Sequence, residues 1–569
     1  MKIQLKYFRA ICFMMVCGAL TISCTKYDNP PAVFEEMKDL VGKQRKVLVI
    51  SIDGLSGQTL KTVEPTQISA LRKESKFSYS TLKTISDAGG WVSMLTGTGF
   101  VKHKTSGDNF ERDIDDNHED HGSVTSYRNV LDYVTQYKAV RTAMITPWSN
   151  LRYYVRNSDY TPIVDSDLKV KDSTINLLNT VQQLGTVFVN FRDVHHAGEK
   201  GGYNVSNVEY KDAITKSDQY VGDILNALKA RKNYDKEDWL VIITTNIGGG
   251  NNDSGNGFVL LHNPAFKEFE LKKSGFNGIQ FNPSTVYAEV SDDHGLYDAG
   301  ATGDFTVQMD VKFNVSTQYP GFLSKSTSMS GSTFTGWLWM QSGANWNVAF
   351  GGTQNGGTGK NQISGANGSV PINDGKWHTL TMVVKTTGGA SPTARTMTAF
   401  IDGNQTVSGS LLNNRSLKVS EGLRVGYRNV DGGGTGLNTN SANLAYFNVA
   451  LDAATVKSSY GLKDFSKHPN YANLKGFWPM DEGTEGTFYN HAPGGYNMSL
   501  RGAYRWMSLG ENFPPGTLPE TITSSLSIVT SASDIAALVM YWMNIEILGD
   551  FGFDGSPYLK NFELEFLKD

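Results

Sequence analysis

The side chains best suited to chemistry each follow a run of apolar, strand-like residues. Asp53, His195, Glu199 and Asn246 all come shortly after such a run. Carboxylates and neutral imidazoles donate lone pairs to a borderline cation such as zinc. Side chains of these types could bind a divalent cation, and no other cofactor is indicated.

Each of these positions also has a structural interpretation. Asp53 could cap the helix that follows its strand. His195 and His196 are adjacent, so in extended backbone they point to opposite sides and at most one faces the same pocket. A satisfied hydrogen-bonding role is the alternative for the histidines. Asp218 lies on a predicted helix, Tyr210 to Ala230, and we expect it to be structural.

The elements that must position these side chains predict an α/β fold. From Arg45 to about Phe281, apolar runs alternate with stretches of helical periodicity, which is typical of α/β proteins. The runs Lys46 to Ile52, Val187 to Phe191 and Trp239 to Thr244 suit buried parallel strands.

A change of composition marks a second body. From about Ser284 to Phe513 the chain is rich in Gly, Ser, Thr and Asn, with short alternating strands such as Phe305 to Val311. This is an all-β pattern. After Leu518 the α/β character returns, with a helical stripe that contains Ile535, Leu538, Val539 and Trp542.

The first residues predict export and a lipid anchor. Lys2, Lys6 and Arg9 precede an apolar run, Ala10 to Leu20, which is too short to span a bilayer and is typical of a secretory signal. The run ends at Thr21-Ile22-Ser23-Cys24, which resembles a lipobox. In such signals the cysteine is acylated, so we expect lipidation at Cys24 and a place in the outer membrane, exposed at the cell surface.

The charge and cysteine content of the chain limit the classes of partner and cross-link that it can have. The net charge is −4, and loss of the three basic residues of the signal makes it −7. A mildly acidic chain without Lys/Arg runs argues against a nucleic-acid partner. The other two cysteines, Cys12 and Cys17, lie in the removed segment, so the exported chain can form no internal disulfide.

Motifs in the two α/β pieces resemble those of the alkaline phosphatase superfamily, particularly its type I phosphodiesterase and nucleotide pyrophosphatase branch. Ile50 to Leu55 is similar to the first strand of that family, and Trp91 to Gly97 to the helix and turn after its nucleophile. Asp193 to Glu199 stands where the family has Asp-x-x-Gly-His, and Thr244 to Gly249 where it has Thr-Ser-Asp-His-Gly-Gly. Ser533 to Leu538 resembles its closing helix.

The resemblance covers roughly 270 residues in two pieces, and it implies one discontinuous domain with an inserted β block. The boundaries that we predict are a signal peptide at 1–23, a tether at 24–44, the first α/β part at 45–283, a β-sandwich at 284–460, an additional β segment at 461–513 and the closing α/β part at 514–569.

The resemblance also implies a two-zinc phosphoryl-transfer site with a hydroxyl nucleophile, and the sequence departs from it. The nucleophile's slot holds Asp87, with Ser86 and Thr84 near enough to be substitutes. The family's Asp-His pair is Asn246-Ile247 here, and isoleucine cannot bind zinc.

Two slots retain ligand types. His195 and Glu199 could still bind a metal, although their order is exchanged, and Asp53 is unchanged. We therefore expect one retained cation, or none, in place of a working two-metal site.

The inserted block has a resemblance of its own. Gly303 to Val307, Gly375 to Leu380, Phe400 to Gly403 and Leu423 to Gly426 look like strands of a LamG or concanavalin-A-like jelly-roll sandwich. Such folds bury large aromatic side chains between two sheets, so we expect Trp377 in the core.

A tryptophan cluster is the candidate carbohydrate-binding site. Trp337, Trp339 and Trp346 lie around the Gly/Asn-rich stretch Gln341 to Gly359, and aromatic faces beside amide side chains suit sugar stacking. Trp337 and Trp339 alternate with Leu338, however, so they share one face and could equally be inner-face residues.

Three functions from different classes remain. The first is a non-catalytic surface lipoprotein that binds a glycan or glycoconjugate beside an outer-membrane importer for nutrient uptake. The second is a metal-dependent phosphodiesterase or phosphatase with a rearranged site. The third is a purely structural subunit.

Overall fold

The computed structural model describes residues 42–113, 126–250, 253–282, 286–327, 334–354, 357–358, 361–365, 370–388, 393–411, 416–427, 436–462, 464–502, 504–509, 513–516 and 526–566. The predicted signal peptide, Cys24 and most of the tether lie outside these residues. None of the helices within these ranges has the length and apolar character needed to cross a membrane.

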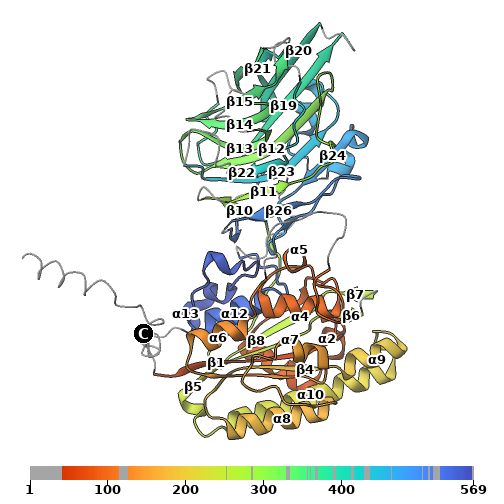
Figure 1. The fold of residues 1–569 in the computed structure, drawn as a ribbon, viewed down its shortest axis with the longest axis vertical. Helices are drawn as coiled ribbons and strands as arrows, with labels where there is room; N and C mark the ends of the chain where they lie inside the picture. Colours follow the sequence, from red (N-terminus) through yellow and green to blue (C-terminus); the bar gives the residue numbers. More distant parts are fainter. Residues whose placement is uncertain are drawn as a thin grey trace, which may run out of the picture.

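A seven-stranded sheet forms the centre of the α/β part (Figure 1). Its order is β3 (Arg141–Ile145), β4 (Leu184–Phe191), β1 (Gln44–Ile52), β5 (Glu237–Thr244), β8 (Gly257–His262), β2 (Ser75–Thr81) and β9 (Phe269–Glu270). The first four strands are parallel. Strand β8 runs antiparallel to both of its neighbours, and β9 is parallel to β2. The three predicted strands are thereby confirmed as β1, β4 and β5.

Helices cover both faces of this sheet (Figure 1). One face carries α4 (Asp87–Thr96), α6 (Val130–Tyr137) and α12 (Asp534–Trp542), and the other carries α2 (Gly57–Val63), α3 (Thr66–Leu71), α8 (Asp167–Thr180) and α10 (Val208–Lys229). Successive side chains of a strand point to opposite faces, so Val47 and Val49 of β1 enter the core under α12, while Leu48 and Ile50 enter the core under α10.

Shorter elements complete this part of the chain. They are α5 (Phe100–His103), α7 (Ser149–Tyr154), α9 (Asp193–Gly201), α13 (Glu563–Phe566), the ribbon β6 (Gly248–Gly250) with β7 (Asp253–Gly255), and the 3-10 turns η2 (Arg72–Glu74), η3 (Tyr234–Lys236), η6 (Gly549–Phe551) and η7 (Tyr558–Phe562).

The predicted helix from Tyr210 to Ala230 is α10, and the structural role expected for Asp218 on it is confirmed. The Asp218 carboxylate accepts hydrogen bonds from the backbone N–H groups of Gln67 at 2.9 Å and Ile68 at 2.8 Å. Because these N–H groups belong to the first turn of α3, they have no partner within their own helix. Asp218 therefore fixes the start of α3 against α10.

Two antiparallel sheets form the second body. The first has the order β21 (Asn404–Ser410), β20 (Ala394–Ile401), β19 (His378–Thr387), β12 (Phe305–Phe313), β23 (Thr439–Phe447), β10 (Asn277–Phe281) and β27 (Trp506–Ser508), with β24 (Leu474–Trp478) also paired to β23. The second has the order β18 (Asn361–Ser364), β15 (Asn345–Gly351), β14 (Gly336–Ser342), β13 (Gln318–Ser326), β22 (Leu423–Gly426), β11 (Tyr287–Val290), β26 (Met498–Arg501) and β25 (Thr487–Phe488).

These sheets enclose one shared hydrophobic core, which makes the body a β-sandwich. Five small elements of the described chain lie outside the two sheets: β16 (Thr353–Gln354), β17 (Gly357–Thr358), α11 (Ala453–Ser459) and the 3-10 turns η4 (Phe465–Lys467) and η5 (Tyr471–Asn473). The sandwich extends beyond residues 284–460, the range predicted for it. Strand β10 ends before residue 283 and β24 begins after residue 460, yet both pair with β23.

The tryptophan cluster lies inside this core, which corrects the prediction of a sugar-binding site there. Trp337, Trp339 and Trp346 are 2%, 0% and 0% exposed, and the rings of Trp339 and Trp346 are 4.6 Å apart. The side chains of β14 alternate, and the face that carries Trp337 and Trp339 points to the opposite sheet. A saccharide cannot stack on rings that are already covered on both faces.

Trp377 corrects a second expectation. It is half-buried, and its ring packs edge-on against Phe276 at 6.1 Å in a separate small cluster. Aromatic side chains of β12 and β14 are among those that fill the core between the two sheets, and Trp377 is not part of it.

Candidate functional site

The carboxyl ends of three neighbouring strands form the candidate site. Strand β1 lies between β4 and β5, and all three run in the same direction. Asp53 follows β1 directly, Arg192 follows β4 directly, and Asn246 comes two residues after β5. Their side chains therefore meet at one edge of the sheet, where ligands collect in open α/β sheets.

Asp53 is fully buried and its carboxylate is satisfied by protein donors. Oδ1 accepts from Ser51 Oγ at 2.7 Å. Oδ2 accepts from Asn190 Nδ2 at 2.7 Å, Trp91 Nε1 at 3.0 Å and Arg192 Nη1 at 3.2 Å. The alternative role of Asp53 as a helix cap is wrong, because the cap of α2 is Ser56, whose hydroxyl accepts from the Thr59 N–H at 3.1 Å.

Arg192 joins Asp53 to the second carboxylate of the site. Its Nη2 donates to Oδ2 of Asp87 at 2.7 Å, while Nη1 donates to Asp53. The guanidinium carbon lies 4.0 Å from the centroid of the Trp148 ring, and Arg192 is 8% exposed. A cation between two carboxylates and an aromatic face is thus supplied by the chain itself.

Asp87 is the first residue of α4, so the positive end of the helix dipole also faces its carboxylate. The Asn246 side chain donates to the Asp87 carboxylate and also, at 3.0 Å, to the Asp87 carbonyl. Burial, followed by the negative charge of Asp87, raises the pKa of Asp53 to about 7. Arg192 opposes this shift but does not cancel it.

The two hydroxyls considered as substitute nucleophiles are engaged with the backbone. Ser86 caps α4: its Oγ accepts from the Gly89 N–H at 3.0 Å and donates to the Ser106 carbonyl at 2.7 Å. Thr84 Oγ1 donates to the Asn246 carbonyl at 2.8 Å. Both roles are structural, because the partners of these two hydroxyls within the described residues are backbone groups.

His195 and Glu199 lie at the rim of the same site. His195 Nε2 is 3.7 Å from Asp87 Oδ2 and 3.4 Å from Glu199 Oε1, and its Nδ1 is 3.2 Å from the Tyr203 hydroxyl. The backbone here is helix α9 and not extended, so the argument from alternating strand faces does not apply. His195 is buried toward Asp87 whereas His196 is exposed, so only one of the two faces the site.

The two zinc ions that the family resemblance implies do not fit this donor set. Both carboxylates of the site are bound by Arg192, and Ile247 presents a hydrocarbon where an imidazole is needed. The described residues contain no group of three or more His, Cys, Asp or Glu side chains arranged to hold a metal ion. The guanidinium stands where a bound cation would have to approach the carboxylates.

Sequence reasoning missed Arg192, Asn190 and Trp148. The sequence position of Arg192 could have indicated its role. Arg192 comes directly after a buried strand, so it has to lie at the same edge of the sheet as Asp53. The order of strands in the sheet was needed to show that the two residues are neighbours.

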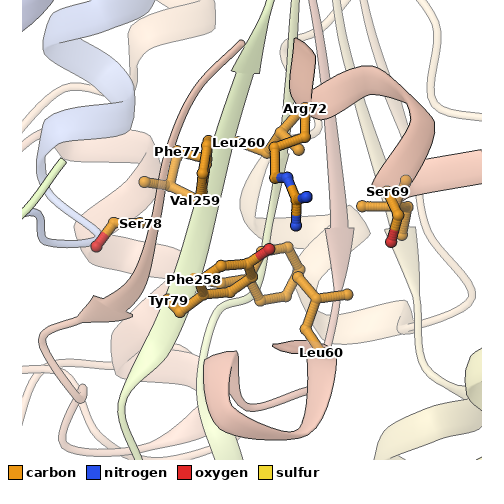
Figure 2. A pocket seen from close by; sticks show the side chains of 10 residues that line it. Leu60, Ser69, Arg72, Phe77, Ser78, Tyr79, Phe258, Val259 and Leu260 are labelled. Carbon is orange, nitrogen blue, oxygen red and sulfur yellow. The ribbon is translucent and has the colours of Figure 1, made fainter. Parts of the chain in front are cut away.

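A small hollow elsewhere in the α/β part is not a ligand site (Figure 2). It lies among Leu60, Phe77, Tyr79, Phe258 and Arg72, with a volume of about 10 Å³. That is room for about one water molecule.

Comparison with known proteins agrees with the fold of the α/β part. A family model described as type I phosphodiesterase / nucleotide pyrophosphatase matches residues 47–369, which is more than half of the chain. A search of curated proteins gives no match.

Three similar solved structures show the range of neighbours. Murine ectonucleotide pyrophosphatase / phosphodiesterase 5 is 17% identical, with a TM-score of 0.29 over 36% of this chain and 57% of that one. An alkaline phosphatase superfamily protein from Vibrio parahaemolyticus is 11% identical, with a TM-score of 0.32 over 41% of this chain and 63% of that one. A candidate carbohydrate-binding protein from Bacteroides ovatus is 11% identical, with a TM-score of 0.30 over 45% of this chain and 74% of that one. The chain thus spans less than two thirds of the first two proteins.

Proposed function

The chain belongs to the type I phosphodiesterase / nucleotide pyrophosphatase family, and we propose that it is a non-catalytic binding protein within that family. One observation carries the proposal: the guanidinium of Arg192 bridges Asp53 and Asp87 at the carboxyl edge of the sheet. The charged side chains at this edge form an internal ion cluster, which stabilises the fold in place of binding metal and substrate.

Electrostatics supports this proposal. Phosphoryl transfer depends on positive charge that is free to stabilise the phosphoryl oxygens in the transition state. The Arg192 guanidinium at this edge is already bonded to two carboxylates. An incoming phosphodiester would meet the Asp87 carboxylate in the nucleophile's slot, and the hydroxyls of Ser86 and Thr84 beside it donate to backbone carbonyls.

We propose a glycan or glycoconjugate as the ligand and the cell surface as the location. Support for the ligand comes from the β-sandwich, whose strand motifs resemble LamG and concanavalin-A-like modules. Support for the location comes from the lipobox-like sequence that ends at Cys24. A place beside an outer-membrane nutrient importer is part of the same proposal, and it rests on analogy between surface lipoproteins.

Metal content and turnover test the non-catalytic part. The mature protein is incubated with zinc, desalted, and assayed for bound metal and for hydrolysis of bis(p-nitrophenyl) phosphate, with Asp53→Ala as the matched variant. We expect less than one zinc ion per chain and the same background hydrolysis for both proteins. Two zinc ions per chain, with turnover lost in Asp53→Ala, would assign the chain to the working hydrolases.

A glycan array tests the binding part independently. The same preparation is labelled and applied to neutral and acidic glycans. Saturable binding to at least one class is expected, and an array without any saturable signal contradicts the binding role whatever the metal assay shows.

A further inference from the structure

A groove lies where the closing α/β segment meets the base of the β-sandwich. It consists of two neighbouring cavities of about 350 and 360 Å³. One wall carries Tyr504, Arg505 and β27, and the other carries residues 545–557, after α12, and η7. Figure 1 shows α12 and α13 below the strands β10 and β26 at this joint. We call this pair of cavities the joint groove.

The two cavities share Trp506, Ser556 and Lys560, so these residues form the middle of the joint groove. The Trp506 ring is held in place: its Nε1 donates to the Glu485 carbonyl at 2.8 Å, and the ring packs edge-on against Phe488 at 5.9 Å. Trp506 nevertheless stays partly exposed. A fixed and partly open indole is a suitable platform for a sugar ring.

Two cations lie beside this indole. Arg505 and Lys560 are both exposed at the joint groove, and within the described part of the chain neither side chain forms an ion pair or a hydrogen bond. Burial, and then the charge of Arg505, lowers the pKa of Lys560. The third cation of the lining, Lys102, is paired with Asp554 and is not free.

The acidic groups nearby limit what can bind. Asp554 is occupied by Lys102 and by the Gly99 N–H at 2.8 Å. Glu563 accepts from the Tyr541 hydroxyl at 2.5 Å. Glu546 lines the first cavity and is exposed, so it disfavours a second anion there. The joint groove therefore suits an isolated anionic group beside an uncharged, polyhydroxylated portion rather than a polyphosphate or a nucleic acid.

Two buried polar groups that line the second cavity lack a hydrogen-bond partner among the described residues. Asn277 and Tyr558 line it, and both residues are buried. Among the described residues, Nδ2 of Asn277 and Oη of Tyr558 have no hydrogen-bond partner. Buried polar groups are nearly always paired, so a bound molecule or ordered water is needed on this side of the joint groove.

We propose that the joint groove binds an acidic oligosaccharide, with a sugar ring on Trp506 and its carboxylate or sulfate between Arg505 and Lys560. This inference rests on the proposed glycan-binding function and adds its location and the class of ligand. It replaces the tryptophan cluster of the sandwich core as the place where the saccharide binds.

Calorimetric titration of the full mature protein tests the proposal with three probes: a xylo-oligosaccharide that carries a single glucuronate, one that carries a single sulfate, and the unsubstituted neutral xylo-oligosaccharide. At least one acidic probe should bind about tenfold more tightly than the neutral one, and its affinity should fall as salt is raised. The double variant Arg505→Gln/Lys560→Gln should lose about tenfold or more of that affinity. The preferred probe distinguishes carboxylate from sulfate.

The matched control removes two charges elsewhere. Lys229 and Lys232 are exposed near the end of α10, so Lys229→Gln/Lys232→Gln should keep the acidic affinity unchanged. Trp506→Phe should bind more weakly while its melting temperature falls by only a few degrees, as expected for the loss of the one hydrogen bond to the Glu485 carbonyl, which separates loss of the platform from unfolding. Two outcomes would contradict the joint groove as the binding site while leaving the glycan-binding function in place: equal affinity for the acidic and neutral probes, or unchanged acidic affinity in Arg505→Gln/Lys560→Gln. No binding by any probe or array glycan overturns both.

Discussion

Replacing Arg192 by methionine should show how much the ion cluster of Arg192, Asp53 and Asp87 contributes to folding stability. Methionine keeps much of the volume beside Trp148 but removes both charged hydrogen bonds, at 3.2 Å to Asp53 and 2.7 Å to Asp87. Each such bond contributes about 1.5–3 kcal/mol, and breaking a buried ion pair by removing one partner costs about 3–5 kcal/mol. Proton uptake limits the loss, because holding an ordinary aspartate protonated at pH 7 costs about 4 kcal/mol.

The loss should therefore depend on pH. At pH 5 the same proton uptake costs only about 1–2 kcal/mol. Because the pKa of Asp53 is already about 7 in the native protein, folded Arg192→Met has to take up one further proton that the unfolded chain releases, so its stability falls more steeply than the native stability as pH rises. Urea-induced unfolding at pH 5 and pH 7 should show losses of about 1–2 and 3–4 kcal/mol relative to the native protein.

Two variants control this measurement. Arg192→Met/Asp87→Asn removes one of the stranded charges and should recover a large part of the loss at pH 7. Arg156→Met changes an exposed arginine and should cost less than about 0.5 kcal/mol. Stability of Arg192→Met equal to the native value at both pH values would refute the reasoning, since it would mean that the guanidinium does not hold the two carboxylates.

Three further predictions concern the fold. Hydrogen bonds to Asp402 at 2.8 Å and to Asp374 at 3.1 Å raise the pKa of His378, so its contribution to folding stability is complete below its ordinary pKa and is lost as pH rises through the folded value. In urea unfolding, His378→Gln should cost about 1–2 kcal/mol at pH 5.5 and clearly less at pH 9, and an equal cost at both pH values would contradict a charged imidazole. Trp339→Ala should destabilise the sandwich by about 3–5 kcal/mol in the same assay, whereas a change in glycan affinity without a loss of stability would return this residue to the ligand site. Asp218→Ala should cost about 1–2 kcal/mol through the lost bonds at the start of α3, and hydrogen exchange at Gln67 and Ile68 should quicken; unchanged exchange would show that the carboxylate does not hold these amides.

The strands of the α/β part could be predicted because their apolar runs are continuous, as in β1, where both faces are buried. Asp53 was placed at the correct edge for the same reason. The helix after Arg192 was harder, since Asp193 to Gly201 contains two histidines and two glycines and has no continuous apolar stripe. Its helical turn brings His195 and Glu199 to the same side.

The ion cluster could not be predicted, because it depends on the pairing of distant residues. Arg192 and Asp87 are 105 residues apart, and only the strand order and the start of α4 bring them together. The burial of the tryptophans could not be predicted either. The alternation in β14 shows that Trp337 and Trp339 share a face, but it does not show whether that face contacts water or a second sheet.

The path of the chain through its two bodies determines when the first can be completed. Helix α12 follows the whole sandwich in sequence, yet its side chains Ile535 and Leu538 fill the same core as Val47 and Trp91. During synthesis the part of this sheet face that α12 covers therefore stays exposed until nearly the last residues have been made. A chain cut short after the sandwich would keep a well-closed carboxyl-terminal body while its amino-terminal half stayed prone to aggregation and proteolysis.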